Sequence, residues 1–311
     1  TTTSNFFPVQ DSRLWVSQLV DRNGKEKFPK EHAAIDQYFC DMDKGGETGL
    51  LMQLWRVLPP GYLSSIIGRW LVPKVLELAK YTALEKFETL TNDVQLQGML
   101  GFVALGCCGV PPSEIAYSLC TGLHLHFEKG AFYPIGGPKS LARGFVNEIN
   151  KAGGRCFVQA AAKEIMTENG KVVGIRLAKK NQVVSTSIVV TTAGLHNTID
   201  KLLGPDDVTQ ERREKIEALP KTHGHMFAFI GFDGDSEEFK LPGSNYWVFP
   251  QPNLDEGMNK FHAAGPEADE PFGYAGIAFP SVKDPTWRQR HPNKTTCEVV
   301  AGDIPWEWFA E

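Results

Sequence analysis

One stretch near the middle of the chain restricts the possible fold more than any other: a glycine pair, an amphipathic helix and three strands in succession. Gly136-Gly137 is followed by Pro138, whose missing N–H costs nothing at the first position of a helix. The apolar residues that then recur at helical spacing are Leu141, Ala142, Phe145, Val146 and Ile149. Because Gly153-Gly154 ends this pattern, the sequence predicts one amphipathic helix that begins directly at the glycine pair.

Three strands are predicted after this helix. The first covers residues 155–161, and Asn169-Gly170 is a strong hairpin signal because both residues tolerate positive φ. Apolar and polar residues alternate again over 171–178. A third strand over 183–192 ends at the small turn Ala193-Gly194, so the sequence predicts a helix followed by a three-stranded meander.

The N-terminal third of the chain is predicted to be helical. A helix is expected over 28–43, closed by Gly45-Gly46, and helical spacing returns over 84–105. Further along, short alternating segments separated by Pro, Gly and Asp predict strands at 226–232, 245–249 and 274–279, as in an antiparallel sheet. These patterns together predict an α+β fold.

Residues 49–78 are unusually apolar, and two interpretations of them remain open. Pro59-Pro60 and Pro73 divide the segment, and no piece reaches the roughly 20 apolar residues that a spanning helix needs. One interpretation is a buried helical hairpin. The other is a surface that lies in a membrane interface, with Trp55, Tyr62 and Trp70 at headgroup level.

Composition and residue spacing exclude several classes of function. The 311 residues carry a formal charge of −5 and no basic patch, so no nucleic-acid partner is expected. The six cysteines form no C-x-x-C pair, and the adjacent Cys107 and Cys108 are predicted to be buried free thiols and not a vicinal disulfide, as suits a reducing compartment. No G-x-S-x-G elbow of a serine hydrolase occurs.

Two alternating histidine pairs could face one side of a strand each. They are His124 with His126, and His223 with His225. Since no third ligand is evident in the sequence for either pair, we predict core or cavity-wall histidines and no metal site.

Several segments resemble one family of enzymes. Residues 109–154 and 189–204 resemble the retinol saturase family, as do FPSVKDPTWRQRHPNKTT at 279–296 and PWEWF at 305–309. The Tyr-Pro-x-Gly-Gly element at Tyr133, the meander and the Ala-Gly turn are also similar to carotenoid desaturases and isomerases. This resemblance implies an α+β flavoprotein that binds FAD and acts on a hydrophobic polyene.

The resemblance also implies a division of the chain. Residues 1–135 would be a mostly helical, substrate- or membrane-proximal part. Residues 136–205 would belong to the FAD-binding domain, and 206–311 would form a truncated substrate-domain sheet. The residues expected near FAD are Gly136, Gly137, Ala162, Lys163, Thr192, Ala193 and Gly194.

The segment before the glycine pair is expected to border the substrate cavity. The cavity residues that the resemblance implies are His124, His126, Phe127, Phe132 and Tyr133. A flavin carries the redox chemistry itself, so the protein needs to supply at most a proton. Tyr133 and His126 are the candidate proton donors.

The sequence departs from the family pattern in three ways. Ile135 stands where the family usually has Arg, and Thr192 where it usually has Asn. No G-x-G-x-x-G opens the chain, and the C-terminal segment that normally covers the flavin is not present. Most of an FAD site is therefore not encoded in these residues.

The family resemblance and the missing FAD-binding motifs together leave two functions open. The first is an FAD-dependent oxidoreductase that saturates, desaturates or isomerises polyene double bonds of a retinoid or carotenoid. The second is a truncated, non-catalytic relative that serves as a structural or pigment-contacting subunit of a larger membrane complex. Either would be associated with a membrane, of the endoplasmic reticulum or of the plastid (thylakoid).

Overall fold

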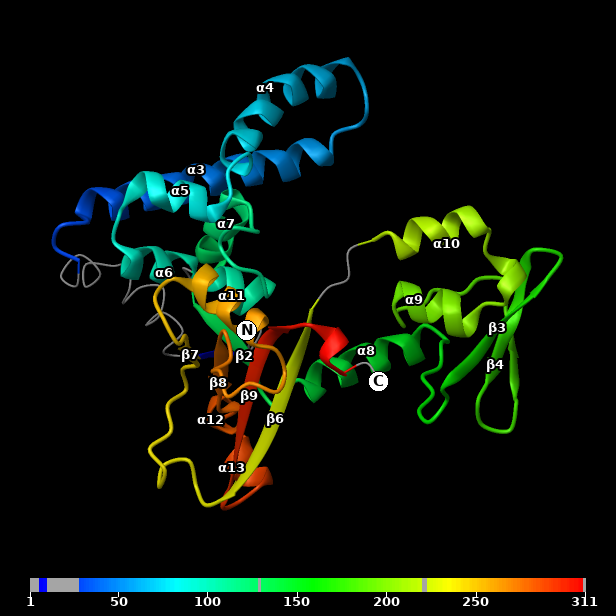
Figure 1. The fold of residues 1–311 in the computed structure, drawn as a ribbon. Helices are drawn as coiled ribbons and strands as arrows, with labels where there is room; N and C mark the ends of the chain where they lie inside the picture. The colour runs from blue at the N-terminus through cyan, green and yellow to red at the C-terminus, as the bar shows by residue number, and fades with distance from the viewer. Residues whose placement is uncertain (1–5, 10–27, 128–129, 220–222, 310–311) are drawn as a thin grey trace. The chain divides into compact units, whose positions relative to one another are not determined.

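The computed structural model describes residues 6–9, 28–127, 130–219 and 223–309, and it confirms an α+β fold with antiparallel sheets (Figure 1). The chain forms two compact units. The helix–sheet unit consists of Thr1–Leu141 and Thr222–Glu311, and the meander unit of Ala142–Lys221.

Helices packed on an aromatic core open the helix–sheet unit. They are α3 (His32–Arg56), α4 (Tyr62–Ala79), α5 (Ala83–Leu90), α6 (Val94–Val103), a π-helical turn (Ala104–Cys108) and α7 (Tyr117–Phe127). The rings of Tyr38, Phe87 and Tyr117 are fully buried, and their centroids lie 6.0–6.1 Å apart. Aromatic rings at this separation stabilise a core beyond the area that they bury.

The prediction that Gly45-Gly46 closes the first helix is wrong, because α3 continues through both glycines to Arg56. The reason is a close helix crossing. A Cβ on Gly46 would lie 2.3 Å from the Leu125 side chain of α7, and one on Gly45 would contact Thr121. The two glycines therefore let α3 approach α7 instead of ending the helix.

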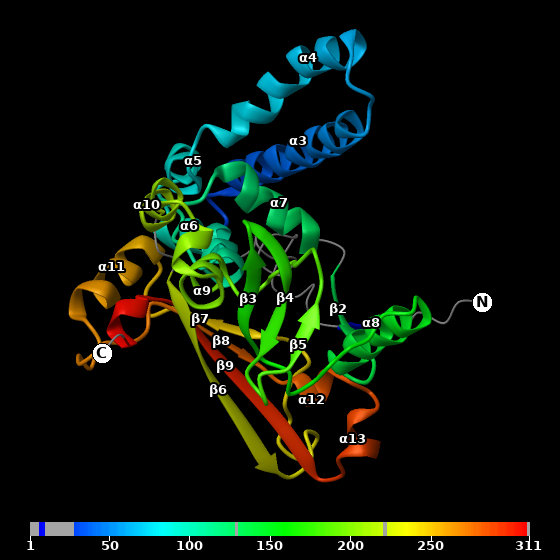
Figure 2. The same cartoon turned by 90° about the vertical axis from the view of Figure 1, so that its right-hand side faces the viewer.

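The apolar segment 49–78 forms a helical hairpin from the second half of α3 and α4, which lie side by side in Figure 2. α4 runs through Pro73, contrary to the predicted break. The hairpin is not buried as one interpretation had it, since Tyr62 and Trp70 are 84% and 57% exposed. Among the described residues, no helix is both long enough and apolar enough to cross a membrane.

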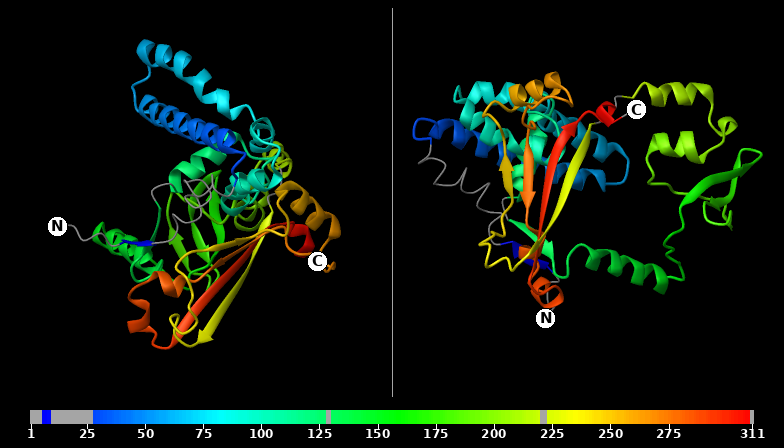
Figure 3. Two further views of the ribbon diagram at one scale, coloured as in Figure 1. Left: turned by 90° about the vertical axis from the view of Figure 1, so that its left-hand side faces the viewer. Right: turned by 60° about the horizontal axis from the view of Figure 1, so that its bottom comes forward.

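A four-stranded antiparallel sheet completes the helix–sheet unit, with the strand order β6-β9-β8-β7. The strands are β6 (Gly224–Asp233), β7 (Tyr246–Val248), β8 (Ala275–Ala278) and β9 (Lys294–Ile304). Figure 3 shows β6 and β9, the two long strands, side by side. Three of these strands were predicted; β9, which lies inside the sheet, was not.

Shorter elements surround this sheet. They are β1 (Phe6–Val9), which pairs with β2 (Ala131–Pro134), and the helices α11 (Leu254–Ala264), α12 (Pro280–Lys283), α13 (Trp287–Arg290) and a 3-10 turn (Trp306–Phe309).

The meander unit contains the predicted hairpin, with altered strand bounds. β3 (Ala162–Glu168) pairs with β4 (Lys171–Leu177) through the Asn169-Gly170 turn, where both φ angles are positive. The first strand thus follows the predicted range 155–161. β5 covers only Val183–Ser185, because its pairing with β4 ends there, so the predicted strand to residue 192 is too long.

The remaining elements of this part of the chain are helical, and the first of them, α8 (Lys139–Lys151), begins before the boundary of the unit. The others are α9 (Leu195–Asn197) with the π-helical turn Thr198–Leu202, the 3-10 turn Pro205–Asp207, and α10 (Gln210–Glu217). α8 begins one residue after Pro138, as its sequence predicts to within the usual margin of helix ends.

Candidate functional site

The glycine pair forms a tight turn between β2 and α8. Gly136 and Gly137 have φ angles of 85° and 76°, which residues with a Cβ adopt at a cost. A Cβ on either residue would meet only ordinary contacts, with Ser140 and with the Tyr133 hydroxyl. The glycines are therefore required by the backbone turn and not by a neighbouring atom that a side chain would strike.

A buried carboxylate holds this turn in place. Asp284 follows α12, is 4% exposed, and accepts hydrogen bonds from the Gly136 N–H at 3.1 Å and from Thr286. Its other oxygen pairs with Arg290. Burial alone would raise the pKa of Asp284, but the hydrogen bonds from Thr286 and Gly136 and the charge of Arg290 hold it below its usual value.

Tyr133, one of the two predicted proton donors, lies in β2 beside this network. Burial raises the pKa of its hydroxyl, and the carboxylates of Asp284 and Glu298 raise it further. The hydroxyl therefore stays protonated at neutral pH and can donate a proton next to Gly137.

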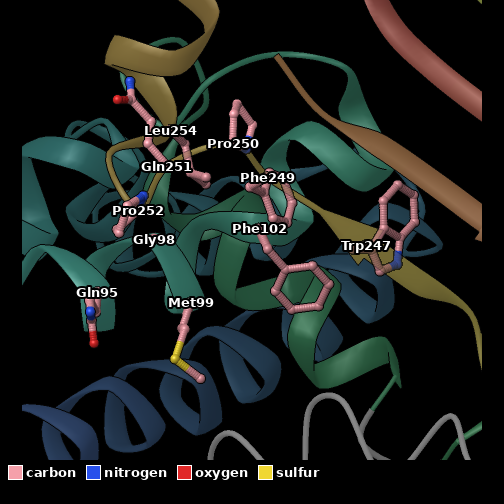
Figure 4. A pocket seen from close by; sticks show the side chains of 10 residues that line it. All are labelled: Gln95, Gly98, Met99, Phe102, Trp247, Phe249, Pro250, Gln251, Pro252 and Leu254. Atoms are coloured by element: carbon pink, nitrogen blue, oxygen red, sulfur yellow. The ribbon is translucent and has the colours of Figure 1, made fainter. Parts of the chain in front are cut away.

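An apolar pocket of about 430 Å³ lies elsewhere in the helix–sheet unit, between α6 and the segment that joins β7 to α11 (Figure 4). Its apolar lining consists of Met99, Phe102, Trp247, Phe249, Pro250, Pro252 and Leu254, and Gln95, Gly98 and Gln251 complete it. A pocket of this size with aromatic walls suits a small apolar ligand. A second hollow of about 750 Å³ is lined mostly by polar and charged side chains and suits such a ligand less.

Two glycines shape the wall of the apolar pocket. Cβ atoms on Gly106 and Gly276 would lie only 3.1 Å and 2.9 Å from the Trp247 ring. The indole is thus held in a slot that side chains on these two residues would narrow. On the opposite wall, Gly98 lets α6 approach the carbonyl of Pro252, where a Cβ would lie 2.2 Å away.

His124 lies behind the pocket wall and does not line the pocket. It belongs to helix α7, not to a strand, and its ring packs at 5.6 Å from that of Phe102. Burial lowers the pKa of His124 to about 3, so the ring is neutral. Nδ1 contacts the Tyr38 hydroxyl, whereas Nε2 has no hydrogen-bond partner among the described residues.

The other predicted cavity residues do not line the pocket. His126 is exposed because residues two apart on a helix face different sides, which breaks the predicted alternation with His124. Phe127 packs edge-on against His126 with the ring centroids 5.0 Å apart, and Phe132 is exposed in β2. The structure thus places Tyr133 at the glycine turn, away from the apolar pocket. The residues that line this pocket were not predicted from the sequence.

The residues predicted near FAD in the meander unit are exposed. Ala162 and Lys163 begin β3, and Thr192, Ala193 and Gly194 form a turn in which Gly194 has a φ of 91°. Side-chain bulk does not obstruct backbone approach at Ala193 and Gly194. Their role in binding FAD stays a prediction.

No protein-family model matches the chain, but comparison of sequences finds several similar proteins. It is 24% identical over 246 residues to a phytoene desaturase (lycopene-forming) of Pseudescherichia vulneris, covering 77% of this chain and 48% of that protein.

A nearer relative is an all-trans-retinol 13,14-reductase. The zebrafish (Danio rerio) enzyme is 30% identical over 297 residues, covering 92% of this chain and 48% of the enzyme. A second zebrafish relative, an inactive all-trans-retinol 13,14-reductase, is 24% identical over the same shares. The resemblance predicted from the sequence is confirmed: the chain is related to the all-trans-retinol 13,14-reductases and spans about half of their length.

One solved structure supports the fold. An oxidoreductase from Methanosarcina mazei matches with a TM-score of 0.50 at 14% identity, covering 72% of this chain and 48% of that protein.

Proposed function

We propose that the protein is part of an FAD-dependent oxidoreductase that acts on the double bonds of a retinoid or carotenoid, with the apolar pocket as the polyene site. The aromatic wall of Phe102, Trp247 and Phe249 carries this proposal. A conjugated chain is long, flat and apolar, and aromatic side chains bury it without leaving polar groups unpaired.

The glycine turn would contribute close contacts to FAD as the cofactor, but no free N–H groups. When bound, FAD would accept or donate the hydride. The Gly136 and Gly137 N–H groups already donate to Asp284 and to the Pro134 carbonyl. They would therefore receive a flat group by close contact and not by hydrogen bonds. The pyrophosphate-binding glycine motif is not among these 311 residues, so this chain would hold only part of the group.

Tyr133 is proposed as the proton donor of the reaction, for which the polyene would have to extend beyond the apolar pocket to the glycine turn. Its raised pKa keeps the proton on the hydroxyl, and its place beside Gly137 lies next to the proposed cofactor contact. His126, the other predicted donor, is an exposed surface residue and is a weaker candidate.

Retinoid binding tests the pocket. Binding of all-trans-retinol to the purified protein, followed by quenching of tryptophan fluorescence, is expected to weaken at least about 10-fold in Met99→Glu, because the new charge is desolvated by the ligand. Val94→Glu is the matched control, since Val94 is exposed on the same helix outside the pocket. Equal loss of binding in both variants would refute the assignment.

An absorbance spectrum of the protein isolated from its natural source tests the cofactor separately. Flavin bands are expected. Their absence, with retinoid binding intact, would contradict the enzyme and favour the second candidate.

That second candidate is a non-catalytic relative, a structural or pigment-contacting subunit of a larger membrane complex. The similarity to an inactive retinol reductase and the departures at Ile135 and Thr192 favour it. It keeps the apolar pocket and loses only the redox step.

Either function agrees with a membrane surface as a partner and with a location at the endoplasmic reticulum or the plastid. Exposed apolar side chains of the α3–α4 hairpin, with Tyr62 and Trp70 among them, would enter the interface. Co-sedimentation with phosphatidylcholine vesicles is expected to fall in Trp70→Asp and to persist in Trp287→Ala. No binding by the unsubstituted protein would exclude this contact.

A further inference from the structure

We propose that His223, His262 and Asp303 form a binding site for a divalent transition-metal ion of the zinc type. One ligand atom from each of the three residues lies within 4.8 Å of the others. This site is independent of the proposed polyene function, because none of the three residues lines the apolar pocket or the glycine turn.

Three separate elements of the helix–sheet unit supply the ligands. His223 directly precedes β6, His262 lies in the last turn of α11, and Asp303 lies near the end of β9. The His223 Nδ1 is 2.5 Å from Asp303 Oδ1, and the His262 Nε2 is 3.4 Å from Asp303 Oδ2. The two imidazole centroids are 5.0 Å apart. Both imidazoles thus meet one carboxylate, one at each oxygen.

A β-bulge directs the carboxylate toward the histidines. Gly224 pairs with Ile304 and Met226 with Ala301, so two residues of β9 oppose one residue of β6 at this point. Asp303 has a φ of 57°, a conformation that Asp tolerates better than most residues. Bulges of this kind re-aim side chains beside functional sites.

The bulge also explains why the sequence pattern was misleading. His223 and His225 were expected to share one face, but the register shifts between Gly224 and Met226. The ring of His225 instead lies against Gly302, whose added Cβ would be 2.9 Å from it. The partner of His223 is therefore His262, which is distant in sequence.

The surroundings favour a bound cation. Asp303 is 6% exposed, and a buried carboxylate is costly unless a cation or several donors neutralise it. Trp308 packs edge-on against Phe261 and His262 and shields one side. The side chains of His223 and His262 remain 38% and 28% exposed, which leaves room for a water as a further ligand.

The donor set selects the class of ion. Two imidazoles with one carboxylate match zinc sites that have three protein ligands and an open fourth position. Calcium and magnesium prefer several oxygen ligands, and the set offers a single carboxylate. The competing arrangement is a metal-free network in which both histidines donate hydrogen bonds to Asp303. His262 Nε2 lies 2.7 Å from the backbone carbonyl oxygen of Asp303, as such a network would have it.

Cobalt(II) titration of the tag-free protein tests the site. One equivalent of Co²⁺ is expected to give ligand-field bands without a thiolate charge-transfer band, and Zn²⁺ is expected to abolish them. His262→Gln and Asp303→Asn each remove a proposed direct ligand. Both are expected to weaken Co²⁺ binding at least about 100-fold, because the loss of an outer-shell partner alone already costs up to about that factor. Asn tolerates the positive φ of residue 303, so this variant keeps the bulge.

Two controls separate the site from other ligands. His291→Gln, at an exposed histidine outside the cluster, should leave binding unchanged. The double variant Cys107→Ser/Cys108→Ser removes the exposed thiol pair and should also bind normally. Circular dichroism checks that each variant folds. Absence of stoichiometric binding, its survival in both ligand variants, or its loss in the cysteine variant would overturn the assignment.

Discussion

The helical core and the meander unit treat their apolar side chains in opposite ways. Tyr38, Phe87 and Tyr117 belong to a cluster of apolar side chains that the helices bury together. In α8, most of which belongs to the meander unit, no residue is buried although the apolar stripe is well formed, and Phe145 is 71% exposed.

The difference shows that forming a helix or strand and burying its apolar face are separate properties. Periodic apolar residues select a helix or a strand, but they do not create the surface that the apolar face needs. Ile188 and Val190 alternate as a strand would require, yet the described part of the chain offers them no pairing and they are exposed. The apolar residues of α8, Ile188 and Val190 are thus of the types found in a protein core, but they are exposed.

The largest effect is expected in the helical core. Phe87→Ala should lower the free energy of unfolding by about 4 kcal/mol, because the truncation leaves a cavity among the rings of Tyr38 and Tyr117. Urea unfolding measures it. A loss below about 1 kcal/mol would mean that this core is as loosely packed as the meander unit.

A smaller effect is expected at the turn where α8 begins. Asp284→Asn should cost about 3 kcal/mol, the low end for breaking a buried pair, since Arg290 is itself partly exposed. The pKa of Asp284 is below its usual value, so its contribution is present above the unfolded pKa and is lost as pH falls through the folded value.

The control for this prediction is the acid limb of unfolding. The unsubstituted protein should lose the Asp284 contribution at low pH, and Asp284→Asn should not. Parallel acid limbs in both proteins would mean that the carboxylate does not stabilise the glycine turn.

His124 should make the helical core sensitive to acid. Its pKa of about 3 lies below the usual value of an unfolded histidine, so stability is fully present above about pH 6.5 and falls as pH decreases toward the folded pKa. The loss between pH 7 and pH 5 should be about 2 kcal/mol. His124→Phe should remove this dependence, as measured by urea unfolding at the two pH values; an unchanged slope would contradict the burial of a neutral ring.

The smallest effect is expected on the exposed face of α8. Phe145→Ser should change the free energy of unfolding by no more than about 0.5 kcal/mol, as for other surface positions. We expect the unsubstituted protein to self-associate through this exposed apolar stripe, and the same variant should reduce that self-association in sedimentation velocity. A loss of several kcal/mol would show that this face is buried in solution and would remove the contrast between the two regions.

Much of the fold was predictable where the signal is local. The helix after Gly136-Gly137 and the hairpin at Asn169-Gly170 follow from periodicity and from residues that tolerate positive φ. β9 was missed even though it lies within the sheet, because its apolar and polar residues do not alternate regularly and its definition depends on pairing with β6 and β8.

The candidate sites were predictable only in part. Tyr133 and the glycine turn are adjacent in sequence, so their proximity is local, whereas Asp284 reaches the turn from 148 residues away. The apolar pocket joins α6 to residues 247–254 across a similar separation. No single-sequence pattern encodes such pairs.

The sequence by itself determined the ancestry, the α+β class and the amphipathic helix beside its glycine pair, because these depend on motifs and on spacing along the chain. Only the tertiary structure decided what the glycines do. Gly45-Gly46 permit a helix crossing and do not end a helix, whereas Gly136-Gly137 make the turn that Asp284 holds. The physical reason is that a missing Cβ allows both a strained backbone and a close contact, and the packing partner determines which is used.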